Sequence, residues 1–446
     1  MSPDRRLLIF ALFAFTALSL LGVAYVGLIG YPFSTPNTAI AAHVPSPEPA
    51  TAFALPPTWT PGPTLTPSLT PLPTLTRLPS TTPSPTATFV LANNLPANYG
   101  PSYYPAGVNP LTGLFVSDPA LLERRPMAIK ITNFPRRVRP QNGLNLADLV
   151  FEYYIEGGLT RFITIFYGND ADQVGPVRSG RFFDEHIVRM YNAIFVFGSA
   201  DKRVLDTWLE SDLLPRLVIP RPGNCPPLCR DQNNPDYNNL YANTAELGPY
   251  VVGRGGDNNK YDLSGMRFQS IVPWGGDLGL DVFVRYSRLD YNHWQYNAAT
   301  GMYERYQETA DDNGQGESYA LMYDGLTGDP VHAANVVVLF APHQEYLRSS
   351  DTEIVQIDLT GFGEAYVFRD GRVYPAVWVR SGVDKPLVLL RSQESTSAFP
   401  LKPGNTFFQI INTGSQLVQE GSSWRFIFNP PAPLPTEEPD IDEGGD

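Results

Sequence analysis

The sequence predicts an α+β fold in which an N-terminal α/β domain with a β-hairpin precedes a mostly antiparallel β domain, behind an N-terminal transmembrane helix. Three patterns predict it: an uncharged apolar run at residues 7–30, alternating strand and helix patterns at 107–265, and strand-length patterns separated by turn residues at 266–430. Strands that alternate with helices are typical of an α/β layer, whereas strands joined by short turns favour antiparallel sheets.

The composition argues against two classes of function. The 446 residues carry a formal net charge of −13, and six of the acidic residues lie in the C-terminal tail at 431–446. The remaining chain is therefore only mildly acidic and has no basic stripe, which argues against nucleic-acid binding. The five histidines and two cysteines show no metal-ligand spacing, so no metal site and no cofactor is predicted.

Residues 7–30 form a run of 24 residues without a charge, which is long enough to span a hydrocarbon core of about 30 Å. Arg5 and Arg6 precede the run and no Lys or Arg follows it until Arg77, so the positive-inside rule places the N-terminus in the cytoplasm and the rest outside. A cleaved signal peptide is the alternative, but the run is longer than the apolar region of most signal peptides. We predict a single-pass protein of the cell membrane, with residues 1–34 as cytoplasmic tip and anchor and an extracytoplasmic globular part.

A stalk follows the predicted anchor. Residues 35–106 are rich in Pro, Thr and Ser, a composition that cannot bury enough apolar surface to fold. At about 3.1 Å per residue, roughly 70 such residues reach roughly 200 Å when fully extended. We therefore predict a disordered spacer at 35–106, and the acidic, Pro-rich residues 431–446 are predicted to be a disordered tail.

The clearest local signal is a β-hairpin that turns at Gly157-Gly158. Residues of alternating polarity flank this pair on both sides, as is typical of a hairpin with a two-residue turn. That turn sets Arg161 diagonally between Glu152 and Glu156 on one face and the apolar residues on the other. The three charges then form either a surface ion-pair ladder or one wall of a polar cleft.

Two arginines, Arg178 and Arg181, flank Ser179, which the pattern predicts to cap a helix over residues 181–191. Arginine has the wrong sign for the dipole at a helix N-terminus. These arginines either pair with acids of the same domain, such as Asp184, or bind an anion beside the free backbone N–H groups. The candidate ligand-binding residues are Arg161, Arg178, Arg181, Glu152, Asp148 and Glu156.

Cys225 and Cys229 are the only cysteines. In an exported protein two cysteines four positions apart favour a local disulfide that closes a small loop. A redox pair is the alternative, but redox pairs usually have the spacing C-x-x-C and are followed by a helix, and neither feature is present at Cys225 and Cys229.

The ordered run NPLTGL, RPMAIKITN, RPQNGLNLADLVFEYYIEGGLTRF and GPVRSGR resembles the YerB family of bacterial putative lipoproteins. The resemblance continues through LYANT, ANVVVLF, EAYVFRDGRVYPAVW and LKPGNTFF, and covers about residues 109–428. It implies an N-terminal α/β domain at 107–265, a β-rich domain at 266–430, and no assigned reaction. Two features depart from the family: an apolar anchor and stalk replace its lipid-modified Cys, and Tyr237 to Tyr241 replace its Pro-His-Asn-Leu-Tyr run.

Two hypotheses on function follow. In the first, the chain is a membrane-tethered binding or interaction module of the bacterial cell envelope, whose partner is a wall polymer or an envelope protein, since many Tyr and Trp residues suit such contacts. In the second, it is an enzyme that acts on an anionic envelope substrate, such as a pyrophosphate or a phosphosugar. Arg161, Arg178 and Arg181 would then hold the anion, and Glu152 or Asp148 would serve as base or metal ligand.

Overall fold

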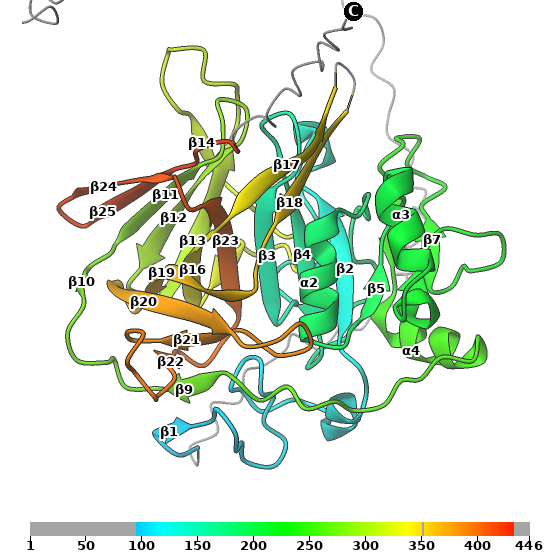
Figure 1. Cartoon of the computed structure of the whole chain (residues 1–446), viewed down its shortest axis with the longest axis horizontal. Helices are drawn as coiled ribbons and strands as arrows, with labels where there is room; N and C mark the ends of the chain where they lie inside the picture. Colours follow the sequence, from blue (N-terminus) through cyan, green and yellow to red (C-terminus); the bar gives the residue numbers. More distant parts are fainter. Residues whose placement is uncertain (1–94, 350–351, 432–446) are drawn as a thin grey trace, which may run out of the picture. The chain divides into compact units, whose positions relative to one another are not determined.

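The computed structural model describes residues 95–349 and 352–431, which belong to one compact unit (Figure 1). The predicted anchor, the predicted acidic tail from residue 432 and all but the last part of the predicted stalk lie outside these residues. Within the described ranges, none of the helices has the length and apolar character needed to cross a membrane.

The larger of two main sheets contains strands from both halves of the chain. Its order is β10-β20-β19-β16-β23-β3-β4-β2-β5-β6, and β21 pairs with β20. In that order the strands are Asp277–Leu278, Arg372–Arg380, Gly361–Arg369, Asn335–Ala341, Thr406–Asn412, Leu149–Tyr154, Thr160–Phe166, Met127–Thr132, Ile194–Val196 and Leu217–Val218, with Val388–Leu390 as β21. The parallel pair of β3 and β23 joins the two halves, so the predicted α/β and β regions share one sheet. The central strands are buried along their whole length, which is why they read as apolar runs.

The second sheet has the order β14-β13-β12-β11-β25-β24, and β15 pairs with β13. Its strands are Tyr319–Leu321, Met302–Glu308, Tyr291–Asn297, Asp281–Arg285, Ser423–Ile427 and Gln416–Glu420, with His332–Ala333 as β15. Three small sheets complete the strands: β1 (Asn98–Tyr99), β9 (Arg267–Gln269) and β22 (Pro400–Leu401); β17 (His343–Arg348) and β18 (Glu353–Ile357); β7 (Leu228–Arg230) and β8 (Leu240–Ala242). Most pairs are antiparallel, as predicted for this half of the chain, although β11–β25, β16–β23 and β9–β22 are parallel.

The described residues contain three α-helices: α2 (Phe182–Met190), α3 (Lys202–Leu209) and α4 (Thr244–Gly253). Short 3-10 helices occur at Pro119–Glu123, Arg136–Val138 and Leu214–Arg216. Figure 1 shows α2 running along strands β4 and β2 on one face of the sheet, and its buried side chains include Phe183 and Ile187. The fold is therefore mostly β with few helices.

The start of α2 corrects the prediction for Ser179. The helix is capped two residues later, at Arg181, whose backbone N–H donates to Asp184 Oδ2 at 2.8 Å. The Ser179 hydroxyl instead shares a hydrogen bond of 2.8 Å with the hydroxyl of Ser199. An acid at the third helical position thus performs the capping that the pattern assigned to the serine.

The hairpin forms where it was predicted, but its turn is one residue longer. The N–H of Ile155 donates to the carbonyl of Leu159 at 2.9 Å, which leaves a three-residue loop with both glycines at positive φ. Arg161 therefore pairs with Tyr153, and Glu152 pairs with Phe162. Because side chains alternate between faces, this shift by one residue puts Glu152 and Arg161 on opposite faces of the sheet.

Candidate functional site

Arg161, Arg178 and Arg181 lie together beside the carboxyl ends of β2 and β5, and we call this cluster the basic edge. Arg161 is paired with Thr132, the last residue of β2, and its Nη1 donates to the carbonyl of Ser179 at 2.8 Å. The backbone of Arg178 bridges the two strands, since its N–H donates to Lys130 and its carbonyl accepts from Gly198, both at 2.9 Å. In α/β sheets this side of parallel strands is where ligands bind.

Two of the three arginines, Arg161 and Arg181, share the carboxylate of Glu156. Arg181 Nε donates to Glu156 Oε2 at 2.7 Å, and Arg161 Nη2 lies 3.8 Å from Glu156 Oε1. Burial and the nearby charge of Arg181 lower the pKa of Arg161 to about 9. Burial opposes the ionisation of Glu156, but the hydrogen bond and charge of Arg181 prevail and lower its pKa. The cluster therefore carries an excess of positive charge.

Arg178 is the least satisfied of the three. In the part of the chain that the structure describes, no carboxylate lies within 4.0 Å of its guanidinium, and its buried Nε has no hydrogen-bond partner. Its guanidinium carbon lies 4.9 Å from the ring centre of Tyr237, a distance typical of cation–π contacts. A guanidinium with free donors presents a planar fork that fits a phosphate or carboxylate.

A buried triad of Lys130, Tyr153 and Asp184 lies under the basic edge. Lys130 Nζ is 3.0 Å from Asp184 Oδ1, the Tyr153 hydroxyl donates to the same oxygen at 2.5 Å, and Lys130 also contacts that hydroxyl. Burial lowers the pKa of Lys130 to about 7. The triad ties β2, β3 and α2 together, which fixes the start of α2 and hence Arg181. The sequence signal for it is a lysine in the middle of an apolar strand.

Glu152 belongs to a different environment on the opposite face. It is fully buried, 2.8 Å from Arg305 Nη1, and it accepts from Gln409 at 2.9 Å and from the Thr160 hydroxyl at 2.8 Å. That hydroxyl also lies 2.8 Å from Asp290, whose pKa burial and the charges of nearby acids raise to about 8. This network joins the two main sheets and was not foreseen from sequence, because its members come from distant strands.

Asp148 lies at the other end of the hairpin from Arg161. Its Oδ2 accepts from the N–H groups of Tyr167 at 2.6 Å and Gly168 at 2.9 Å, and its Oδ1 accepts from Asn109 at 2.8 Å. Burial raises its pKa to about 6. The carboxylate therefore closes the loop after β4 and does not reach the basic edge, so neither Asp148 nor Glu152 joins the arginines.

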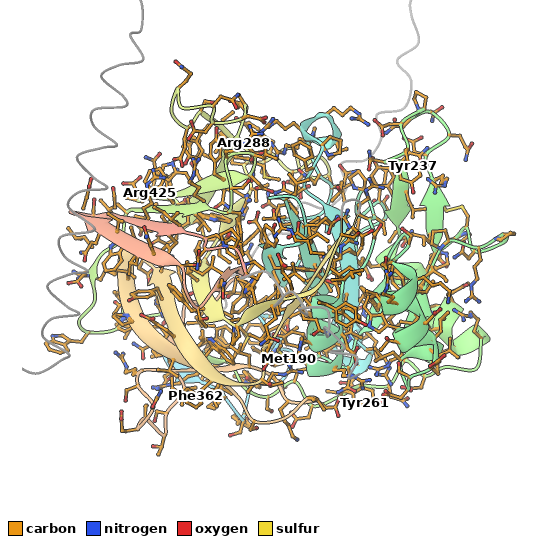
Figure 2. The ribbon with its side chains drawn as sticks, turned by 45° about the horizontal axis from the view of Figure 1, so that its top comes forward. Met190, Tyr237, Tyr261, Arg288, Phe362 and Arg425 are labelled. Atoms are coloured by element: carbon orange, nitrogen blue, oxygen red, sulfur yellow. A yellow bond between two sulfur atoms is a disulfide. The ribbon has the colours of Figure 1, made fainter. Side chains whose placement is uncertain are left out.

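A groove beside β7 and β8 adjoins the basic edge. Cys225 and Cys229 are bonded to each other, and Cys229 and the two prolines between the cysteines line one wall of a groove of about 280 Å³. Arg230, another lining residue, lies 5.9 Å from the ring centre of Tyr237, the same ring that Arg178 contacts. Figure 2 places Tyr237 at the periphery of the molecule, and its side chain is 66% exposed.

Across residues 95–349 and 352–431, no three His, Cys, Asp or Glu side chains are grouped so that they could hold a metal ion. The arginines of the basic edge are donors of a kind that suits an anion, and the one carboxylate that forms ion pairs with them among the described residues, Glu156, is already paired with Arg161 and Arg181.

Comparisons with known proteins confirm the resemblance seen in the sequence. Residues 111–257 match the N-terminal domain, and residues 282–408 the C-terminal domain, of a protein family of unknown function, DUF3048; together these matches cover more than half of the chain. The chain is 27% identical over 315 residues to the putative lipoprotein YerB of Bacillus subtilis, covering 68% of this chain and 85% of that protein. The crystal structure of the YerB protein from Bacillus subtilis has the same fold, with a TM-score of 0.55 at 24% identity over 68% of this chain and 96% of that one.

Proposed function

Since this chain belongs to the DUF3048 family, whose two domains it carries in order, we propose that it is a binding module of the bacterial cell envelope whose extracytoplasmic head holds an anionic group at the basic edge. The name of its relative, a putative lipoprotein, supports association with the cytoplasmic membrane. In this chain residues 7–30 would provide the anchor. The partner would be a phosphate- or carboxylate-bearing wall polymer, or an acidic segment of an envelope protein.

The unpaired guanidinium of Arg178 carries this proposal. Arg161 and Arg181 share Glu156, whereas Arg178 has no carboxylate within 4.0 Å among the described residues, and its Nε is buried without a partner. A buried donor left unsatisfied costs about 1–3 kcal/mol, and more for a charged group. An anion that accepts from Arg178 would remove this cost and neutralise part of the excess charge.

The second hypothesis, that the chain is an enzyme acting on a pyrophosphate or a phosphosugar, has less support. In this hypothesis the base or metal ligand is Glu152 or Asp148. Glu152, however, is paired with Arg305 on the face of the sheet opposite Arg161, and Asp148 lies at the other end of the hairpin from the arginines. Burial lowers the pKa of Lys130 beneath the arginines to about 7, yet its side chain is fully enclosed. The positions of Glu152, Asp148 and Lys130 therefore fit a binding module better than an enzyme.

Titration calorimetry of the full chain with pyrophosphate tests the proposal. We expect Arg178→Ala to weaken binding tenfold or more, because hydrogen bonds to charged groups contribute about 1.5–3 kcal/mol. The matched control is Arg288→Ala, an exposed arginine on another loop of the head (Figure 2), which should bind as the parent does. Equal affinities of the parent and Arg178→Ala, or no binding by the parent, would overturn the proposal.

A further inference from the structure

The segment between β9 and β11, which includes the two-residue strand β10, exposes an unusual amount of apolar side-chain surface, and we call residues 271–280 the apolar loop. Trp274 is 95% exposed, Ile271 is 63% exposed and Leu278 is 55% exposed. Val272 and Leu280 are exposed as well. Large apolar side chains gathered at one place on a soluble surface mark a site of contact with a protein or a membrane.

The rest of the head holds the backbone of the apolar loop in place while its side chains stay in solvent. Six side chains donate hydrogen bonds to its carbonyl oxygens, and the pairs are Gln269 with Ile271 (2.9 Å), Arg369 with Ile271 (3.4 Å), Tyr374 with Pro273 (2.8 Å), Arg372 with Gly276 (3.0 Å), Trp424 with Leu278 (2.9 Å) and Tyr303 with Gly279 (2.7 Å). The positive φ of Gly275 and Gly276 makes the turn that follows Trp274. The exposure is therefore built into the fold, since a loosely held loop would have no such set of donors.

The apolar loop lies where the chain enters the head. β1 is the first described strand and runs antiparallel to β9, so the residues before it pass beside the residues after β9. The N–H of Ser270, next to Ile271, donates to the carbonyl of Ala97 at 3.3 Å. Figure 1 shows β1 and β9 side by side at one end of the head. Everything between the head and the apolar run at 7–30 joins the head at this point.

We propose that the apolar loop docks the head onto the lipid surface of the membrane that carries the anchor. This inference rests on the membrane tether of the proposed function. Tryptophan is enriched at membrane interfaces because its ring is apolar and its N–H is polar. Arg267 and Arg372 flank the loop and suit the phosphates of lipid headgroups, while Asp277 within the loop opposes insertion beyond the headgroup level.

Because the head is tethered to the membrane, a surface as small as the apolar loop is enough to dock it onto the lipid. A single exposed loop gives a weak membrane affinity, but a head linked to the same bilayer binds it in an intramolecular step, at a high effective concentration. A soluble protein partner would gain nothing from the position of the apolar loop beside the incoming chain.

Tryptophan quenching in nanodiscs tests the proposal. The full chain, with Trp59→Phe in every variant, is reconstituted into nanodiscs whose acyl chains carry bromine, a collisional quencher, and into unbrominated discs. Of the other tryptophans, Trp208, Trp294 and Trp378 are fully buried in the head and Trp424 is nearly so. We expect bromine to remove most of the fluorescence that Trp274 contributes, and we expect Trp274→Phe to show no such loss.

Two outcomes would overturn the docking. One is equal quenching of the parent and Trp274→Phe. The other is no quenching together with a dimer by sedimentation that Trp274→Ser and Ile271→Ser dissolve, which would make the apolar loop an interface between copies. Failure of the tether itself is distinguishable, because the chain would then not be recovered in the discs at all.

Discussion

Lys130 should give the head a pH-dependent stability that a single substitution removes. Its pKa is lowered to about 7 by burial from an ordinary value of 10.5, so between these two pH values the unfolded chain binds a proton that the folded chain has lost. Stability rises with pH wherever the unfolded state binds more protons. Within this window, Lys130 alone therefore raises the free energy of unfolding by up to about 1.4 kcal/mol for each pH unit.

The measurement is urea unfolding between pH 8 and 9.5, followed by fluorescence of the buried tryptophans. Asp290 and Arg161 also titrate near this range, but they are common to both proteins, so the difference between the parent and Lys130→Met isolates the lysine. We expect the free energy of unfolding to rise from pH 8 to pH 9.5 by about 2 kcal/mol more in the parent than in the variant. Parallel stability curves would show that Lys130 stays charged and paired with Asp184, and would refute the reasoning.

Two further predictions concern the two faces of the hairpin. Arg305→Met should lower the free energy of unfolding in urea by about 3–5 kcal/mol, because it leaves the buried Glu152 carboxylate without its cation. A decrease of less than about 1 kcal/mol would contradict this role of Arg305. Glu156→Gln should strengthen pyrophosphate binding severalfold at low ionic strength, because Arg161 and Arg181 lose their shared carboxylate, and the gain should fade in about 1 M salt. Weaker binding in calorimetry would show that Glu156 positions the arginines and does not compete with the anion.

The hairpin shows what a local pattern can and cannot predict. Gly157-Gly158 fixes the place of the turn, because both glycines adopt positive φ at little cost. The same pair fits a two-residue and a three-residue loop, and the sequence contains nothing that selects between them. A difference of one residue leaves the strands intact but moves Glu152 to the opposite face from Arg161.

The long-range pairings lie beyond the reach of local patterns for a physical reason. Lys130 signals a buried partner, yet Asp184 is 54 residues away, and Glu152 meets Arg305 across 153 residues. Such contacts form because the strand order places β3 next to β23 and the second sheet over it, and no hydrophobic period encodes that order. The clustering of the three arginines was open from sequence, since Arg161 could face either side until the turn length was known.

The strand order also relates the two proposed surfaces. The apolar loop contains β10, the strand that ends the large sheet, whereas the basic edge begins at β4, six strands along the sheet. At roughly 4.8 Å per strand the two are separated by roughly 30 Å along the sheet. If the head rests on the bilayer through the apolar loop with the large sheet upright, Arg178 lies well away from the lipid headgroups, and their phosphates do not compete for it. The anion that it binds would then come from the wall side, which favours a wall polymer over a membrane lipid as its source.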